Sequence, residues 1–155
     1  MFTHVVFSAG LVCYVARALG LPPAEAILLA AFAAVMQVAI DVLSHETVYT
    51  GSATLHRRTP FLHSPSGALL SAAVFTAVLA YVLRPDGHAL PVLFASMLVA
   101  SYSHLLLDLF TERGIYVRGK RVWRKRMFKY DNPLLNLVFT SIGIFLLIES
   151  LQPHP

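Results

Sequence analysis

The sequence predicts an all-α fold, a polytopic membrane bundle of about five transmembrane helices with two longer cytoplasmic loops. Of the 155 residues, 57% are hydrophobic and only 13% are charged. The mean hydropathy of +0.67 is far above that of an ordinary soluble domain. The apolar residues also gather into stretches of about 20, the length that crosses a hydrocarbon core roughly 30 Å thick. We therefore expect residues 1–155 to form a single membrane-embedded domain.

Polar or proline-rich segments separate the apolar stretches from one another. The stretches are Val5–Leu21, Ala24–Leu43, Ser66–Leu83, Ala89–Phe110 and Leu134–Leu151. Ser64 and Asn132 each stand directly before a proline, and this order of N-cap and first helical residue predicts where the third and fifth helices begin. Cys13 is the only cysteine, which excludes a disulfide framework and a cysteine-built zinc site.

Basic residues are concentrated in the two longer connections, Ser44–Pro65 and Thr111–Pro133. Together these hold ten of the twelve Lys and Arg residues, and Arg17 and Arg84 are the other two. The positive-inside rule therefore predicts an integral protein of the cell membrane with the N-terminus in the cytoplasm and the C-terminus outside. Seven of the basic residues lie in Arg118–Lys129, which we expect to contact anionic lipid headgroups. Nucleic acid is a less favoured partner, because no nucleic-acid-binding fold is visible.

Two local patterns allow further interpretations. Ala16–Ala18 resembles a signal-peptide cleavage site, and cleavage there would remove His4. No basic residue precedes the first apolar run, which favours a retained helix instead. In the second long connection, Ile115–Trp123 alternates around Arg118 and predicts a small surface hairpin.

Histidine and aspartate recur at helical spacing near the cytoplasmic ends of the predicted helices. Asp41 precedes His45 by four residues, and His104 precedes Asp108 by four, so each pair would share one helix face. An ionisable side chain in a membrane segment costs a few kcal/mol unless it is paired, hydrated or bound to a metal, so these faces should point into the bundle. Two further histidines begin the first and third helices at the same depth. The predicted ligand set is His4, Asp41, His45, His63, His104 and Asp108.

Imidazole and carboxylate groups bind zinc and other divalent transition metals, so we expect a divalent metal, most simply zinc. Each residue alone has a simpler explanation, such as a hydrogen-bonded Asp–His pair or an interfacial histidine. The joint placement at one face favours a metal site, because His88 and His154 on the opposite side have no carboxylate at helical spacing. Haem held by paired histidines is an alternative that leaves the aspartates unexplained.

Four motifs occur in an order that resembles a known family. They are Thr3–Ser8, Asp41–His45, Arg58–Ser64, and Ser103–Asp108 followed by Thr111 and Gly114. This set resembles the LexA-binding, inner-membrane-associated hydrolases, also described as membrane-bound metal-dependent hydrolases, and in particular an archaeal branch described as a domain of unknown function. Relatives usually carry two aspartates just before the histidine of the second motif. Many relatives also have His-Arg-Gly before a Thr-His-Ser in the third motif. This chain has neither, which leaves the role of His56 open.

The resemblance implies a metal-dependent hydrolase, distantly similar to zinc-dependent phospholipase C, that acts on a phosphoester or phospholipid at the cytoplasmic membrane face. Asp41 or Asp108 would bridge metal ions or orient the attacking water, and Arg58 would hold the phosphate. The alternative is a non-catalytic metal-binding or metal-transporting protein that uses the same ligands. Few polar residues lie in the outer halves of the predicted helices, which disfavours a transport path. The sequence does not predict an oligomeric state.

Overall fold

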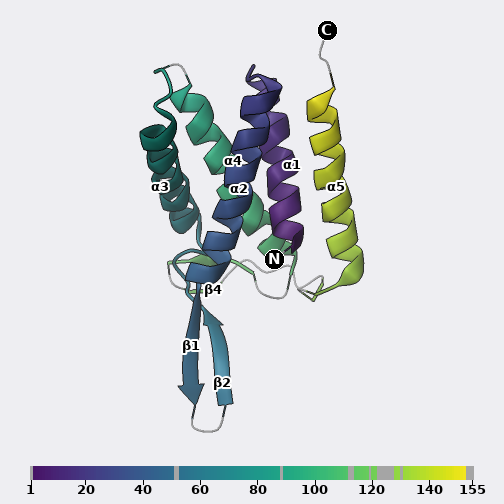
Figure 1. Ribbon diagram of the computed structural model, residues 1–155. Helices are drawn as coiled ribbons and strands as arrows, with labels where there is room; N and C mark the ends of the chain where they lie inside the picture. Colours follow the sequence, from purple (N-terminus) through teal and green to yellow (C-terminus); the bar gives the residue numbers. More distant parts are fainter. Residues whose placement is uncertain are drawn as a thin grey trace.

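Five helices form the bundle in the computed structural model (Figure 1). The structure describes residues 2–50, 53–87, 89–111, 114–118, 120–121, 128–129 and 131–152, and the side chains of residues 45–58 and 121 are outside this description. The helices are α1 (Phe2–Ala18), α2 (Pro23–Leu43), α3 (Pro65–Leu83), α4 (Leu90–Phe110) and α5 (Pro133–Leu151). The predicted all-α membrane bundle is confirmed.

Four of the helices, α2 to α5, are long and apolar enough to cross a membrane. The remaining helix, α1, has 17 residues and lies inside the bundle, in contact with α2, α4 and α5. It ends earlier than the predicted Leu21 because Gly20 adopts a φ of 90° and the Leu21 amide donates to the Ala16 carbonyl oxygen. This left-handed glycine is a common helix terminator.

The predicted starts of α3 and α5 are confirmed by their caps. The Ser64 hydroxyl accepts a hydrogen bond from the Gly67 amide at 3.1 Å, and the Asn132 side chain accepts one from the Leu135 amide at 3.0 Å. In both helices a proline occupies the next position, where it has no intrahelical hydrogen bond to lose.

Two antiparallel β-hairpins occupy the longer connections. One pairs β1 (His45–Thr50) with β2 (Ala53–Arg58), and nothing in the sequence analysis predicted it. The other pairs β3 (Tyr116–Val117) with β4 (Lys120–Arg121), which confirms the predicted surface hairpin. Because α2 ends at Leu43, His45 begins β1 and is not in helical register with Asp41 as predicted.

One end of the bundle carries the start of α1 and both hairpins, and we call it the site end (Figure 1). The C-terminal end of α5 lies at the opposite end. This arrangement agrees with the predicted alternation of short and long connections. Which end faces the cytoplasm stays a prediction.

Glycines set the distance between α1 and α5. A Cβ atom on Gly10 would overlap the carbonyl oxygen of Gly143, and a Cβ on Gly143 would lie 2.6 Å from the carbonyl oxygen of Val6. Small residues allow such close backbone approach between membrane helices. The contact fixes α1, and with it His4, against the last helix of the chain.

Candidate metal centre

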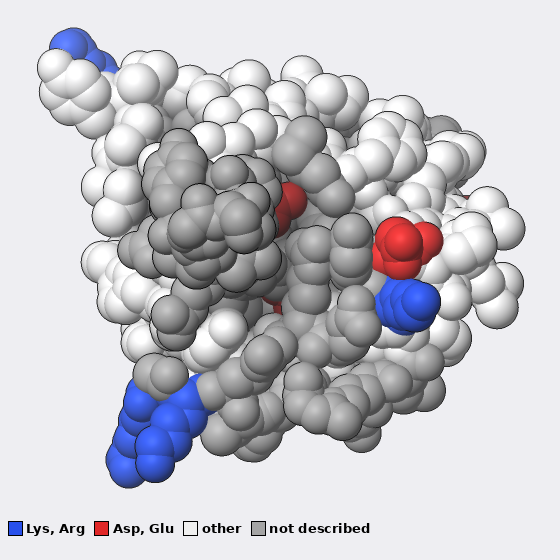
Figure 2. Space-filling view, turned by 90° about the horizontal axis from the view of Figure 1, so that it is seen from below, with Lys and Arg blue, Asp and Glu red and all other residues white. Residues whose placement is uncertain are grey.

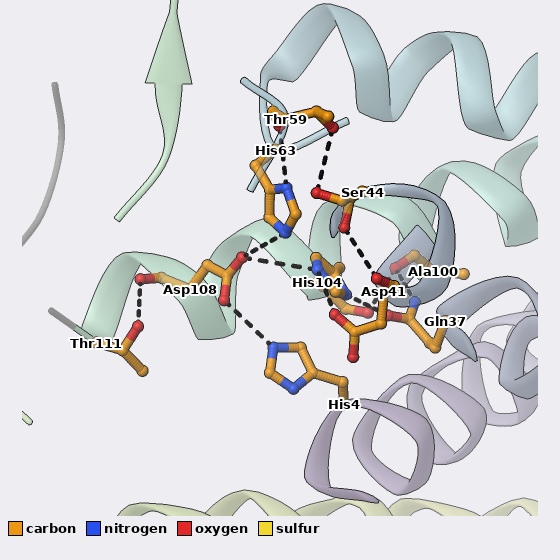
Figure 3. A network of polar contacts seen from close by, with 11 residues as sticks. His4, Gln37, Asp41, Ser44, Thr59, His63, Ala100, His104, Asp108 and Thr111 are labelled. Atoms are coloured by element: carbon orange, nitrogen blue, oxygen red, sulfur yellow. Dashed lines mark hydrogen bonds and ion pairs between the residues drawn. The ribbon is translucent and has the colours of Figure 1, made fainter. Parts of the chain in front are cut away.

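Five of the six predicted ligands converge at the site end (Figure 3). His4 comes from α1, Asp41 from α2, His63 from the segment before α3, and His104 and Asp108 from α4. The Asp108 carboxylate lies 3.5 Å from His4 Nε2, 3.6 Å from His63 Nε2 and 3.6 Å from His104 Nε2. The Asp41 carboxylate lies 3.8 Å from His104 Nε2. Four segments, distant in sequence, therefore bring three imidazoles and two carboxylates into one cluster.

Gln37 fixes the orientation and tautomer of His104. The Gln37 side-chain amide nitrogen donates to the backbone carbonyl of Ala100 at 2.8 Å and to the hydroxyl of Ser8 at 3.1 Å. A carbonyl oxygen can only accept, so the other Gln37 atom, Oε1, must be the one 2.8 Å from His104 Nδ1. His104 therefore donates from Nδ1, and in the neutral ring the lone pair belongs to Nε2.

His63 has the same arrangement with a backbone partner. Its Nδ1 lies 3.4 Å from the carbonyl oxygen of Thr59, which can only accept a hydrogen bond. In the neutral ring the lone pair again belongs to Nε2, the atom that faces Asp108. Metal-binding histidines typically donate their second ring nitrogen to a carbonyl or carboxylate in this way.

The spacing of the ligand atoms agrees with a cation between them. A lone pair on a neutral imidazole nitrogen repels a carboxylate oxygen at 3.6 Å, so a proton or a metal cation has to lie between the facing atoms of His63, His104 and Asp108. Ligands of a tetrahedral zinc ion with bonds of roughly 2.0–2.1 Å lie about 3.3–3.4 Å apart. The observed separations of 3.5–3.8 Å are close to this value. The residues present are thus suitable ligands for a divalent metal.

Two overlapping groups of three ligands share His104. One comprises His4, His104 and Asp108, and the other comprises Asp41, His63 and His104, with the ligand atoms of each group within 4.8 Å of one another. The side chains of His63, His104 and Asp108 are at most 1% exposed, whereas His4 is 15% and Asp41 12% exposed. The centre is therefore closed on the α3–α4 side and open at its α1–α2 edge.

The segment after α4 fixes the backbone of Asp108 and His63. The Asp108 carbonyl oxygen accepts hydrogen bonds from the Thr111 amide, the Thr111 hydroxyl and the Gly114 amide, at 3.2, 3.0 and 3.1 Å. Gly114 has a φ of 63°, which favours glycine. Two residues later, the Tyr116 amide donates to the His63 carbonyl oxygen at 2.9 Å. Thr111 and Gly114, which follow the fourth motif, thus hold the backbone at Asp108 in place.

The base of the β1–β2 hairpin holds the segment that leads to His63. The amide and the hydroxyl of Thr59 both donate to the carbonyl oxygen of Ser44, at 2.7 and 3.3 Å. A Cβ atom on Gly67 would overlap the Phe61 carbonyl oxygen, so the absence of a side chain there permits the turn before α3. These contacts place His63 opposite α4.

His45 and Arg58, the other predicted site residues, are paired with each other at the base of the hairpin, directly after Ser44 and before Thr59. Their side chains, like that of His56, are outside the described part of the structure, and so are His88 and His154. Their proposed roles stay predictions.

The basic segment Arg118–Lys129 is described in part. Arg118, Lys120 and Lys129 are exposed. Viewed from the site end, the described Lys and Arg side chains form separate groups (Figure 2). Contact of this segment with lipid headgroups stays a prediction.

Three residues that orient the candidate ligands are not among the predicted site residues. Gln37 and Ser8 each stand four residues from a ligand, Asp41 and His4 respectively, so helical spacing was a usable signal for both. Thr59 acts on His63 through its backbone carbonyl, which no side-chain pattern reports.

Comparison with known proteins agrees with a membrane protein of this architecture. No curated protein and no solved structure matches the chain significantly. A family-wide sequence profile, described as YdjM inner membrane protein, matches residues 1–149. The match confirms the inner-membrane part of the predicted relationship, whereas LexA binding, hydrolysis and an archaeal origin stay predictions. The chain is an integral membrane protein that belongs to the YdjM inner membrane protein family.

Proposed function

We propose that the protein is a membrane-embedded metal-dependent hydrolase that cleaves a phosphoester at the membrane face. The observation that carries this proposal is the pair of buried imidazoles, His63 and His104, whose Nε2 atoms face carboxylate oxygens at 3.6–3.8 Å while their Nδ1 atoms face obligate acceptors. A buried His–Asp cluster oriented in this way suits a divalent metal better than it suits structural hydrogen bonds.

The ligands would divide the work according to their positions. Asp108 faces three imidazoles and is the proposed central metal ligand, held with His4, His63 and His104. A bound zinc ion would lower the pKa of water to about 7 and polarise a phosphoryl oxygen. The Asp41 carboxylate lies 3.8 Å from His104 Nε2 and is 12% exposed at the open edge, so we assign it to orient the attacking water and accept its proton.

Phosphate recognition is assigned to Arg58, with His45 as an additional ligand. A guanidinium group offers paired donors that match phosphate oxygens. The backbone places both residues at the base of the hairpin, beside the segment that carries His63. The proposal therefore puts the phosphate between the hairpin base and the open edge of the centre.

Metal transport is less well supported by the same structure. Beyond Gln37, the described interior is mainly an apolar cluster that includes Val12, Met36, Leu79 and Met97, and its buried polar side chains are single hydroxyls such as those of Ser96 and Thr76. Such a cluster offers an ion no continuous series of ligands across the bilayer. Hydrolysis at one face needs no such series.

Metal-stripped and reloaded protein provides the test. Purified protein treated with a chelator should not hydrolyse bis(p-nitrophenyl) phosphate or a phospholipid, and zinc or manganese should restore the activity. Hydrolysis that persists in the metal-free protein would contradict the proposal. So would the absence of hydrolysis in protein shown by elemental analysis to be loaded.

The proposed cytoplasmic location of the site end rests on the ten basic residues in its two connections. Reporter fusions at the C-terminus and within the β1–β2 hairpin should give opposite signals. If the hairpin reporter is active on the outer side of the cell membrane, the proposed orientation is wrong.

A further inference from the structure

An open apolar groove runs along the lipid-facing side of α2 next to the candidate metal centre. Its volume is about 560 Å³, and its lining consists of Val5 from α1 together with Ala34, Val35, Val38, Ala39, Val42 and Leu43 from α2. Every lining residue is apolar. The groove lies on a helix that is long and apolar enough to span the membrane, so we expect it to face the hydrocarbon chains of the bilayer.

The groove lies beside the open edge of the centre. Asp41 follows the lining residues Ala34 and Val38 on the same face of α2, at spacings of seven and three residues, and Val5 directly follows His4 on α1. His4 and Asp41 are also the two most exposed ligands, at 15% and 12%, while the other three are at most 1% exposed. A molecule in the groove would therefore reach the metal ligands from the side of the bilayer.

The length of the groove corresponds to part of a lipid chain. Ala34 and Val42 are eight residues apart on one helix, a separation of about 12 Å at 1.5 Å per residue. Ala34 is farther from the site end than Val42, so the groove extends from the centre toward the middle of the bilayer. A lipid whose phosphate lies at the centre would have its chain along this direction.

We propose that this groove receives a hydrocarbon chain of the substrate. The substrate class is then a phosphate-bearing membrane lipid, which enters from the bilayer between the start of α1 and the end of α2. The inference rests on the proposed hydrolase function and adds the nature of its substrate. Water-soluble phosphoesters would then lack a binding contribution that positions the lipid, and lipid substrates would react faster.

The other described pocket of comparable size does not share these properties. It measures about 320 Å³, lies at the end of the bundle opposite the centre, and includes Glu25 and Asp86 in its lining. Acidic groups in a pocket disfavour both a hydrocarbon chain and a phosphate. Of these two pockets, the groove on α2 is the one with an entirely apolar lining and a position beside the candidate ligands.

Photolabelling tests the groove without any need for hydrolysis. The probe is a phosphatidylglycerol with a diazirine within one acyl chain, in phosphatidylcholine vesicles that contain the metal-loaded protein. The control surface is α3, where Val74, Val78 and Val82 are 51%, 54% and 60% exposed, comparable with 59% for Val35. We expect residues 34–43 to be labelled several times more than residues 74–83. Equal labelling would overturn the inference.

Turnover provides the second test, with a matched pair of substitutions. Val35→Trp fills the groove about two helical turns from Asp41, and Val78→Trp adds the same side chain to α3. We expect V35W to lower the ratio of phosphatidylglycerol to bis(p-nitrophenyl) phosphate hydrolysis by about tenfold or more, because misplacement of a substrate strongly slows its reaction. V78W should leave both rates unchanged.

The outcomes separate the two proposals. If metal-loaded wild-type protein hydrolyses neither substrate, the proposed function is wrong. If it hydrolyses both and V35W leaves the ratio of the two rates unchanged, the hydrolase proposal holds and the groove inference is overturned.

Discussion

The two ends of the bundle use polar side chains in different ways. At the end opposite the centre, Arg17 donates to the carbonyl oxygens of Leu21 and Ser150, at 2.8 and 3.1 Å. Asp86 accepts from the Ala89 amide at 3.0 Å. Each of these charged groups meets a backbone partner and closes a helix end or a turn, which is sufficient reason for its presence.

At the site end, charged and ionisable side chains face one another across four segments of the chain. The Asp108 carboxylate meets three imidazoles, and Gln37 uses its hydrogen bonds to orient one of them, His104. Burying such a group is costly, and nothing about closing a helix requires it. The difference between the ends supports the proposal that the site end has a role beyond folding.

Removing a ligand should have the largest effect and should separate the two ends directly. His104→Ala and Asp108→Asn should each lower bound metal and hydrolytic rate by roughly a hundredfold or more, since even residues that only orient a ligand typically contribute 10- to 100-fold. Elemental analysis and phosphoesterase assays measure the two quantities.

Asp86→Ala is the matched control at the opposite end. It removes a carboxylate that accepts a hydrogen bond from the Ala89 amide, far from the histidine cluster, and it should leave metal content unchanged. Equal metal content in D86A, H104A and D108N would mean that the histidine cluster binds no metal and that the ends do not differ in function.

Loss of Gln37 should have the next largest effect. Gln37→Leu removes the acceptor of His104 Nδ1, and we expect metal affinity to fall by about 10- to 100-fold. Ser101→Ala is the control, because Ser101 is as buried as Gln37 and its hydroxyl donates to the Met36 sulfur at 3.8 Å, not to a candidate ligand, in the described part of the structure. If both variants lose affinity in proportion to their thermal stability, Gln37 has a structural role alone.

The sequence was sufficient to predict most of the fold and the position of the centre. Apolar length located all five helices, and Ser64 and Asn132 located two helix starts, because capping is a local property of the chain. Helical spacing was also sufficient to place His104 beside Asp108. Membrane-spanning segments can be predicted as helices because each segment must satisfy its own backbone hydrogen bonds.

Contacts between segments distant in sequence could not be predicted in the same way. The Thr59 amide donates to the Ser44 carbonyl oxygen at the base of the β1–β2 hairpin, and α2 ends at Leu43, so His45 lies in β1 and not at helical spacing from Asp41. The carbonyl that orients His63 belongs to Thr59, and backbone groups carry no residue-specific signal. Tertiary context therefore decided the details of the centre.

A smaller effect is expected at the glycine contact that fixes α1 and His4. Gly10→Ala should destabilise the bundle by about 1–3 kcal/mol, because the added methyl group meets the Gly143 backbone. In a helix without that contact, the same change would stabilise by up to about 1 kcal/mol. Unfolding in mixed micelles measures the change.

Gly87→Ala is the control for this comparison, because a Cβ atom there meets nothing within 4 Å. Its free energy of unfolding should stay close to that of the wild type. A stabilised Gly10→Ala variant would show that α1 and α5 do not approach as closely as the structure has them.

The smallest effects should come from the two N-caps, and they sharpen the comparison between structure and chemistry. Asn132→Ala and Ser64→Ala each remove one capping bond, which contributes about 1 kcal/mol to the free energy of unfolding, and Ser64→Ala also removes the hydrogen bond from the Ser64 hydroxyl to the Phe61 carbonyl oxygen. Ser64 directly follows His63, whereas Asn132 lies at the start of α5. We therefore expect S64A to lower metal affinity as well, and N132A to change stability alone. Equal metal affinities in the two variants would mean that the cap does not position His63, and that the Thr59 and Tyr116 contacts are sufficient to hold it.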